Sequence, residues 1–308
     1  MKIPIAMIAL LSLAGFVRAD DLDDTFTNLK DAVAQKKSAD EILTLATQTS
    51  KLARAAAVKP KPEDVEAESY QQRIQFAKDA DSYTEYALSS TAVQTAEPAK
   101  VVALVDQLIA ENPKSTYLDG CAAAYLSALN KQGGAAKMLD GAAKINAGRP
   151  ENELALSQLA EGYASKSPDR AVGYANKLLG LMKTKAKPEG VSDADWAAQK
   201  NALTGTAYYV TGIANFQKQV WVDCDRDLKA SLPYIGKDSG KLSTAYFALG
   251  VCNYQFGKLT QDRTRIQAGE KFSEQSAAIA GPMQAQARTN VAAMQRELGA
   301  GTGLATKR

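Results

Sequence analysis

Three cysteines and a set of acidic side chains are the residues through which this chain could do chemistry. The sequence has 308 residues and contains no histidine. The lack of imidazole excludes Ser-His-Asp and Cys-His catalysis, histidine-ligated zinc sites and histidine pH switches. Three cysteines are too few for a disulfide framework or for a zinc site with four thiolate ligands. Any chemistry would therefore rest on carboxylates or on one disulfide.

Two of the cysteines could form that disulfide. Cys224 and Cys252 lie on consecutive predicted helical hairpins, on helices that we expect to be close. In an oxidising compartment they could cross-link the two hairpins, which would leave Cys121 unpaired. The alternative is that all three are separate, buried small residues. The sequence leaves both interpretations open.

The acidic clusters do not have the spacing of a metal site. The cluster at 20–24 lacks the calcium-loop pattern and its turn glycine, so we expect it to favour the start of a first helix. The aspartates at 223–227 alternate along the chain, and residues two apart do not share a helix face. A carboxylate-based enzyme acting on glycans would need a paired Asp/Glu cleft, which no feature marks. We therefore predict no metal, no cofactor and no catalytic residue.

The first 19 residues have the layout of a cleaved secretory signal. Lys2 supplies the basic start, residues 3–17 are mostly apolar, and Val17 and Ala19 are small residues before a predicted cut at Asp20. The apolar run is short for a membrane span. We expect a mature chain without a membrane span, located in the periplasm or secreted.

Composition and charge favour an ordinary helical protein over a nucleic-acid binder. Hydrophobic residues make up 45% of the chain and aromatic residues 7%, and the formal net charge is only +3. Strand signals are nearly absent, whereas helix starts such as Ser38–Glu41 and Ser167–Asp169 are well marked. We predict an all-α fold of about thirteen helices near 22–36, 38–57, 63–92, 97–111, 115–130, 133–146, 150–166, 168–184, 193–218, 220–235, 239–256, 262–280 and 282–299.

These helices pair in a pattern that resembles the tetratricopeptide repeat (TPR) superfamily, of an exported bacterial type. The family's repeat places small residues where two helices approach closely and large residues between neighbouring helices. The match is degenerate: spacing is irregular, and the usual tyrosine at position 11 is kept in two of five units. The residues that carry the match are Tyr83, Ala87 and Ala99; Leu118, Cys121 and Tyr125; Leu156, Ala160 and Tyr163 with Pro168–Leu178; Tyr208, Gly212 and Cys224; and Tyr246, Gly250, Ala268 and Phe272.

The resemblance implies a right-handed superhelix whose concave face binds peptides or proteins. The positions that line that face in the family fall on two predicted helices of this chain, near 193–218 and 239–256. An aromatic groove with neighbouring amides suits an extended peptide or a sugar. The alternative is that these rings pack in the core. The candidate groove residues are Thr206, Tyr209, Ile213, Phe216, Gln217, Thr244, Phe247, Val251, Tyr254 and Gln255.

We therefore expect an exported, non-catalytic scaffold that binds a protein or peptide partner. A structural subunit of a cell-envelope assembly is the alternative, and a glycan-active enzyme is a more distant one. The partner and the oligomeric state do not follow from the sequence. The expected organisation is a signal peptide at 1–19, a helical hairpin at 20–60, TPR-like repeats at 61–281, a capping helix at 282–298 and a disordered tail at 299–308.

Overall fold

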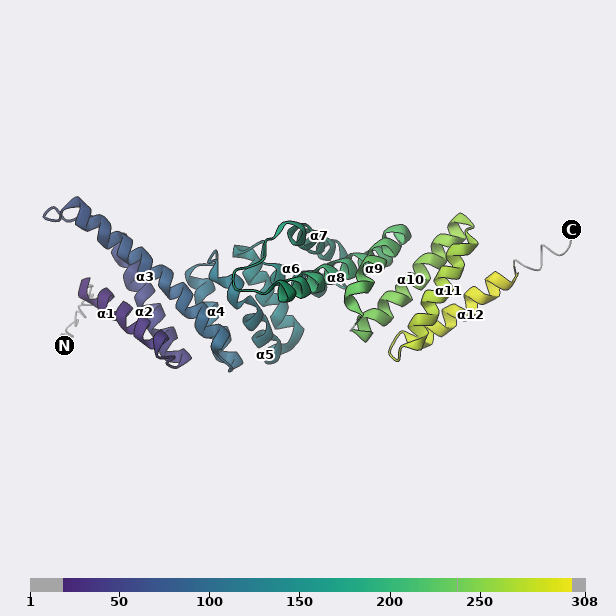
Figure 1. Ribbon diagram of the computed structural model, residues 1–308, viewed down its shortest axis with the longest axis horizontal. Helices are drawn as coiled ribbons and strands as arrows, with labels where there is room; N and C mark the ends of the chain where they lie inside the picture. The colour runs from purple at the N-terminus through teal and green to yellow at the C-terminus, as the bar shows by residue number, and fades with distance from the viewer. Residues whose placement is uncertain (1–18, 237, 301–308) are drawn as a thin grey trace, which may run out of the picture. The chain divides into compact units, whose positions relative to one another are not determined.

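The computed structural model describes residues 19–236 and 238–300, and this part of the chain is all-α (Figure 1). It contains twelve helices and no strand. Most of the predicted signal segment and of the predicted tail lies outside the described residues. Within the part described, no helix combines the length and the apolar character that a membrane span needs.

The chain divides into two compact units between Cys121 and Ala122. The described part of unit 1 contains four helices and the start of a fifth. They are α1 (Ala19–Ala34), α2 (Ala39–Ala57), α3 (Ala67–Gln94), α4 (Pro98–Glu111) and α5 (Tyr117–Gly148).

The described part of unit 2 contains the rest of α5 and seven further helices. They are α6 (Glu153–Tyr163), α7 (Pro168–Thr184), α8 (Asp193–Gln217), α9 (Trp221–Ile235), α10 (Ser239–Thr260), α11 (Arg263–Ala278) and α12 (Gln284–Ala300). From α6 onward each helix packs against the next one along the chain. In addition, α6 contacts α8, α8 contacts α10, and α10 contacts α12. Across the described helices, no corresponding contact joins α7 to α9 or α9 to α11.

Helix α5 is two helical segments joined at a pair of glycines. The backbone leaves helical geometry at Gly133 and Gly134, and Gly134 has a positive φ of 68°. A Cβ atom added at Gly141 would lie 2.1 Å from Leu129 Cδ1, so the second segment folds back against the first. The structure thus agrees with the two separate helices predicted on either side of residue 132.

The same tight turn recurs in three hairpins. Lys36, Gln219 and Gln261 each have a positive φ, between 52° and 61°, within two residues of the end of α1, α8 and α10. In each turn the amide of the next residue reaches back to the carbonyl five residues earlier, in the last turn of the helix, as in a Schellman motif. These bonds run from Lys37 N to Ala32 O at 2.9 Å, from Val220 N to Asn215 O at 2.9 Å and from Asp262 N to Gly257 O at 2.8 Å.

Small residues bring the paired helices of unit 2 into backbone contact. A Cβ added at Gly269 of α11 would lie 2.7 Å from the carbonyl oxygen of Gly250 and 3.0 Å from the amide nitrogen of Tyr254, both on α10. At Gly212 of α8 it would lie 2.6 Å from Leu228 Cγ on α9. The repeat pattern places a small residue at Gly212 and Gly250. On α11 it indicates Ala268, whereas the buried residue in contact is Gly269.

Glu111, at the end of α4, gives unit 1 a pH-dependent contribution to stability. Burial raises the pKa of its carboxyl above the ordinary value, while a hydrogen bond from Gln107 Nε2 (2.8 Å) opposes the shift. The folded state therefore holds this proton more tightly than the unfolded state, and stability is lost as pH rises from the unfolded to the folded pKa. We expect Glu111→Gln to raise the free energy of unfolding at pH 7 and to have no such effect below pH ~4.

Urea unfolding of Glu111→Gln and wild type at both pH values measures this difference. Glu41→Gln, at an exposed carboxylate, is the control. A stabilisation that is equal at both pH values would contradict the burial argument.

Candidate functional site

The predicted groove residues lie on α8 and α10, two helices that contact each other in unit 2. Tyr209 on α8 is half-buried beside Thr244 on α10. Burial raises the pKa of the Tyr209 hydroxyl, and a hydrogen bond with Thr244 opposes the shift. Phe216 on α8 meets Phe247 on α10 edge to face, with ring centroids 6.3 Å apart. The structure therefore brings these two pairs together across the α8–α10 contact.

The aromatic bodies of this face also contribute to the core. Phe216 packs against Trp221 at the start of α9, with ring centroids 6.4 Å apart. Tyr209, Ile213 and Phe216 pack on the buried cluster that contains Leu228 and Leu249. The core interpretation thus accounts for much of their burial. The other predicted residues are half-buried, except for the exposed Gln217; the half-buried ones are Thr206, Phe247, Val251, Tyr254 and Gln255.

Charged side chains extend the face to α6 and α12, and sequence reasoning missed them. Lys241 at the start of α10 forms an ion pair with Glu161 of α6. Its ammonium group also lies 5.8 Å from the centroid of the Tyr209 ring. At the other end, the Tyr254 hydroxyl donates to Glu297 of α12, and Lys258 Nζ lies 5.3 Å from the Tyr254 ring centroid. We call the surface formed by these residues and the predicted groove residues the α6–α12 face.

Cys224 and Cys252 form a disulfide between α9 and α10. Their Cα atoms are 6.5 Å apart, and both residues are fully buried. The residues that follow them are also joined, because Asn253 Nδ2 donates to Asp225 Oδ1 at 2.6 Å. The bridge therefore links the α8–α9 hairpin to the α10–α11 hairpin. Cys121 is a free, buried thiol in unit 1, and burial raises its pKa.

The aspartates near Cys224 are occupied by cations and amides. Asp227 accepts from Asn215 Nδ2 at 3.0 Å and pairs with Arg226 at 2.7 Å. Asp225 pairs with Lys229 at 2.8 Å. These bonds tie α8, α9 and α10 together and account for the charges that the sequence left unexplained. Within the described residues there is no group of three His, Cys, Asp or Glu side chains placed to hold a metal ion.

The chain matches no known protein family, no curated protein and no solved structure.

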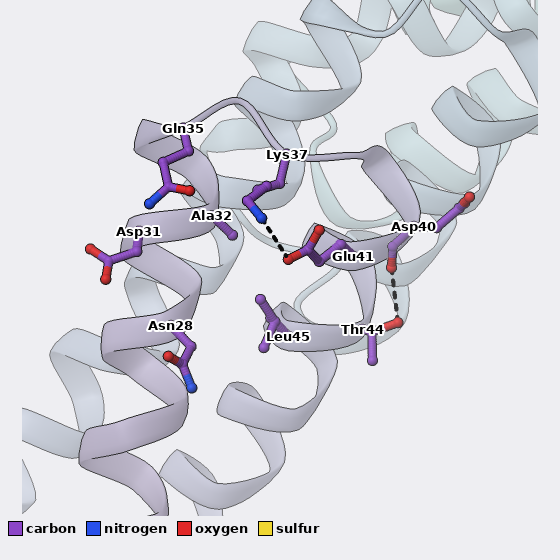
Figure 2. Close-up of a pocket in the computed structure, with 9 residues that line it drawn as sticks. All are labelled: Asn28, Asp31, Ala32, Gln35, Lys37, Asp40, Glu41, Thr44 and Leu45. Carbon is purple, nitrogen blue, oxygen red and sulfur yellow. Dashed lines mark hydrogen bonds and ion pairs between the residues drawn. The ribbon is translucent and has the colours of Figure 1, made fainter.

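A hollow between α1 and α2 of unit 1 is a weaker candidate (Figure 2). Its polar groups mainly satisfy one another: Lys37 pairs with Glu41 at 3.7 Å, and the Thr44 hydroxyl donates to the Asp40 carbonyl at 2.8 Å. Asp40 also pairs with Lys100 of α4 at 3.3 Å. Figure 2 shows Asp31 pointing away from the hollow. Seven of its nine lining residues carry polar or charged side chains, which does not favour a ligand site.

Proposed function

We propose that the chain is an exported, TPR-like scaffold that binds a protein or peptide partner along the α6–α12 face, without catalysis. The observation that carries this proposal is the unequal contact between alternate helices. Helices α6, α8, α10 and α12 contact one another in series, whereas α7, α9 and α11 do not, within the described helices. In a curved array of hairpins, the layer whose helices lie closest together is the inner one. The α6–α12 face would then line the concave side of a right-handed superhelix.

The side chains of this face suit an extended polypeptide. Tyr209, Phe247 and Tyr254 provide contact area at low conformational cost. Gln217 and Gln255 provide amide groups that can pair with a partner's backbone. Lys241 and Glu161 place opposite charges side by side at one end of the face, which would favour one direction of the bound chain. Export rests on the signal-like residues 1–19.

Capture from a cell-envelope extract tests the proposal with variants that spare the packed rings. The face variant is Gln217→Ala/Lys241→Glu/Gln255→Ala. The matched control, on the exposed sides of α7 and α11, is Asn176→Ala/Lys177→Glu/Gln267→Ala. We expect the wild type and the control to retain a partner that the face variant retains at least tenfold less, which corresponds to about 1.4 kcal/mol.

Circular dichroism must show equal folding of the three proteins before capture is compared. A partner lost by the control variant and kept by the face variant would move the site to the other layer of helices. Failure of the wild type to retain any partner would count against a scaffold function.

A further inference from the structure

Unit 1 carries a row of aromatic side chains on its surface. Phe26 of α1 lies 5.6 Å from Phe76 and 5.5 Å from Tyr83, both on α3, measured between ring centroids. The row continues from Tyr83 to Tyr86 at 5.5 Å and from Tyr86 to Tyr117 at 6.0 Å. Phe76, Tyr86 and Tyr117 are 37%, 42% and 36% exposed. We call these five residues the aromatic row.

The core of unit 1 accounts for only part of this row, since Phe26 packs against the buried cluster that contains Ala77 and Ala80. Helix α3 turns alanines inward, since Ala77, Ala80 and Ala87 are fully buried. Phe76 and Tyr83 share a stripe of the helix with Ala80 and Ala87, because these residues are three or four positions apart. Phe76 and Tyr86 nevertheless remain exposed. Single exposed apolar residues are common on protein surfaces, whereas a contiguous exposed apolar area of this kind is typical of an interaction surface. A hydrogen bond from Ser89 Oγ of α3 to the backbone carbonyl of Tyr117 (2.9 Å) holds the far end of the row in place.

An apolar cavity opens next to the row, between α1, α2 and the start of α3. Its volume is about 270 Å³, which is slightly below that of a typical small-molecule pocket and fits one or two side chains. A hydrogen bond from Tyr70 Oη to the Lys59 carbonyl (2.8 Å) holds the α2–α3 loop over it. Apolar residues form most of its wall, namely Leu22, Leu52, Ala56, Pro60, Pro62, Val65, Ile74 and Phe76.

Arg73 and Phe76 connect this cavity to the row. Both line the cavity, and both also line an open hollow that includes Phe26 and Gln72. Cavity, hollow and row therefore form one continuous track along α3. From Ser69 in the hollow to Tyr86 in the row, the helix advances by roughly 25 Å. An extended peptide of about eight residues has the same length.

The cavity and the hollow have more basic than acidic side chains in their walls. Lys30, Lys59 and Arg73 line the cavity and the hollow, against a single carboxylate, that of Asp23. Among the described residues Arg73 has no ion-pair partner within 4.0 Å. An arginine guanidinium beside an apolar cavity suits a carboxylate that neighbours a bulky apolar group.

We propose that unit 1 binds an extended peptide segment that is both apolar and acidic. One bulky apolar side chain of the partner fills the cavity, a neighbouring carboxylate pairs with Arg73, and the chain then follows the aromatic row. A flat bilayer surface matches the track less well, because it cannot reach into the recessed cavity. This site lies in a different unit from the α6–α12 face, so either can fail without the other.

Selection of random eight-residue peptides displayed on phage, against the immobilised chain without residues 1–19, tests the proposal. We expect the enriched peptides to carry a bulky apolar residue close to an aspartate or glutamate. The best one is then synthesised with a fluorescent label, and its affinity is measured by anisotropy. We expect Arg73→Glu to weaken binding at least tenfold, and Phe76→Ala/Tyr86→Ala to do the same.

Lys78→Glu is the matched control, because it makes the same change of charge at an exposed position on another side of α3. It should change affinity less than twofold, and the face variant of unit 2 should leave affinity unchanged. Equal losses for Arg73→Glu and Lys78→Glu would reduce the effect to net charge and overturn the site. So would a selection that enriches no apolar and acidic peptides. Arg73-dependent binding to phosphatidylglycerol vesicles without peptide binding would assign the track to a membrane surface instead.

Discussion

Reduction of the Cys224–Cys252 disulfide lowers the melting temperature of unit 2 by about 10 °C. The bridge spans 28 residues, and the chain-entropy model assigns a loop of that length roughly 3–4 kcal/mol. In a unit of this size, each kcal/mol moves the midpoint by about 2–4 °C. The effect is large because the link joins two hairpins that otherwise meet only through side-chain packing and hydrogen bonds.

Thermal melts followed by circular dichroism, with and without a phosphine reductant, measure this effect. Cys224→Ala/Cys252→Ala should melt at the lower temperature under both conditions. Cys121→Ala should remain sensitive to the reductant, because Cys121 is a free thiol. A wild type whose melting curve ignores the reductant would show that the bridge contributes little to stability.

Gly269→Ala is expected to destabilise the protein by about 1–3 kcal/mol, although alanine is the better helix former. The added methyl group would meet the backbone of α10, at the Gly250 carbonyl and the Tyr254 amide. Backbone atoms cannot move aside as a flexible side chain can, so α10 and α11 would have to separate. That separation would disturb the α6–α12 face at Tyr254 as well.

Gly173→Ala on α7 is the control for this substitution. A Cβ atom there meets nothing within 4 Å, so the helix should gain about 0.5–1 kcal/mol. Urea unfolding of both variants gives the two free-energy changes, which should have opposite signs. A Gly269→Ala protein as stable as wild type would mean that the two helices are not in backbone contact.

Much of the fold follows from local signals in the sequence. Helix α7 begins and ends where it was predicted, at Pro168 and Thr184, because a proline at the first helical position favours its start. Ser167 occupies the N-cap position but forms no side-chain cap hydrogen bond. The capping serines Ser38 and Ser192 also accept the predicted amide hydrogens, at 3.2 and 3.1 Å. Each of these signals acts within one turn of helix, between residues that are neighbours in the sequence, and can therefore be predicted from the sequence alone.

Two predicted helices begin too early. The helix predicted near 63–92 starts only at Ala67, because the chain forms a turn at Pro62. Pro282 likewise precedes the start of α12 at Gln284. The α2–α3 loop is instead held by a tertiary contact, the hydrogen bond of Tyr70 to Lys59. Contacts of this kind override local preference and cannot be predicted from composition.

The binding surfaces were predictable only in part. Repeat spacing placed Tyr209 and Thr244, and Phe216 and Phe247, on one face, and the structure brings these pairs together. The charges of the same face come from far along the chain, since Lys241 meets Glu161 across 80 residues. No short-range pattern encodes such a pairing.

The aromatic row did leave a signal in the sequence. Phe76 and Tyr83 are seven residues apart, with Ala77, Ala80 and Ala87 interleaved. At helical spacing, Phe76, Ala80, Tyr83 and Ala87 share one side of α3, so large and small residues alternate along it. The repeat pattern instead assigned Tyr83 to fill a gap between helices. In the structure it does contact Phe26 of α1, but as a member of a partly exposed row.

The position of the disulfide also determines how the chain responds to tension. If the chain holds a partner as proposed, it can be pulled along its length. If the helices between residues 224 and 252 unravel, the bridge carries the load directly and the enclosed segment stays slack. The oxidised chain is therefore shorter at full extension by roughly 100 Å, the length of 28 extended residues. The redox state of one bond thus sets the reach of the whole molecule under force.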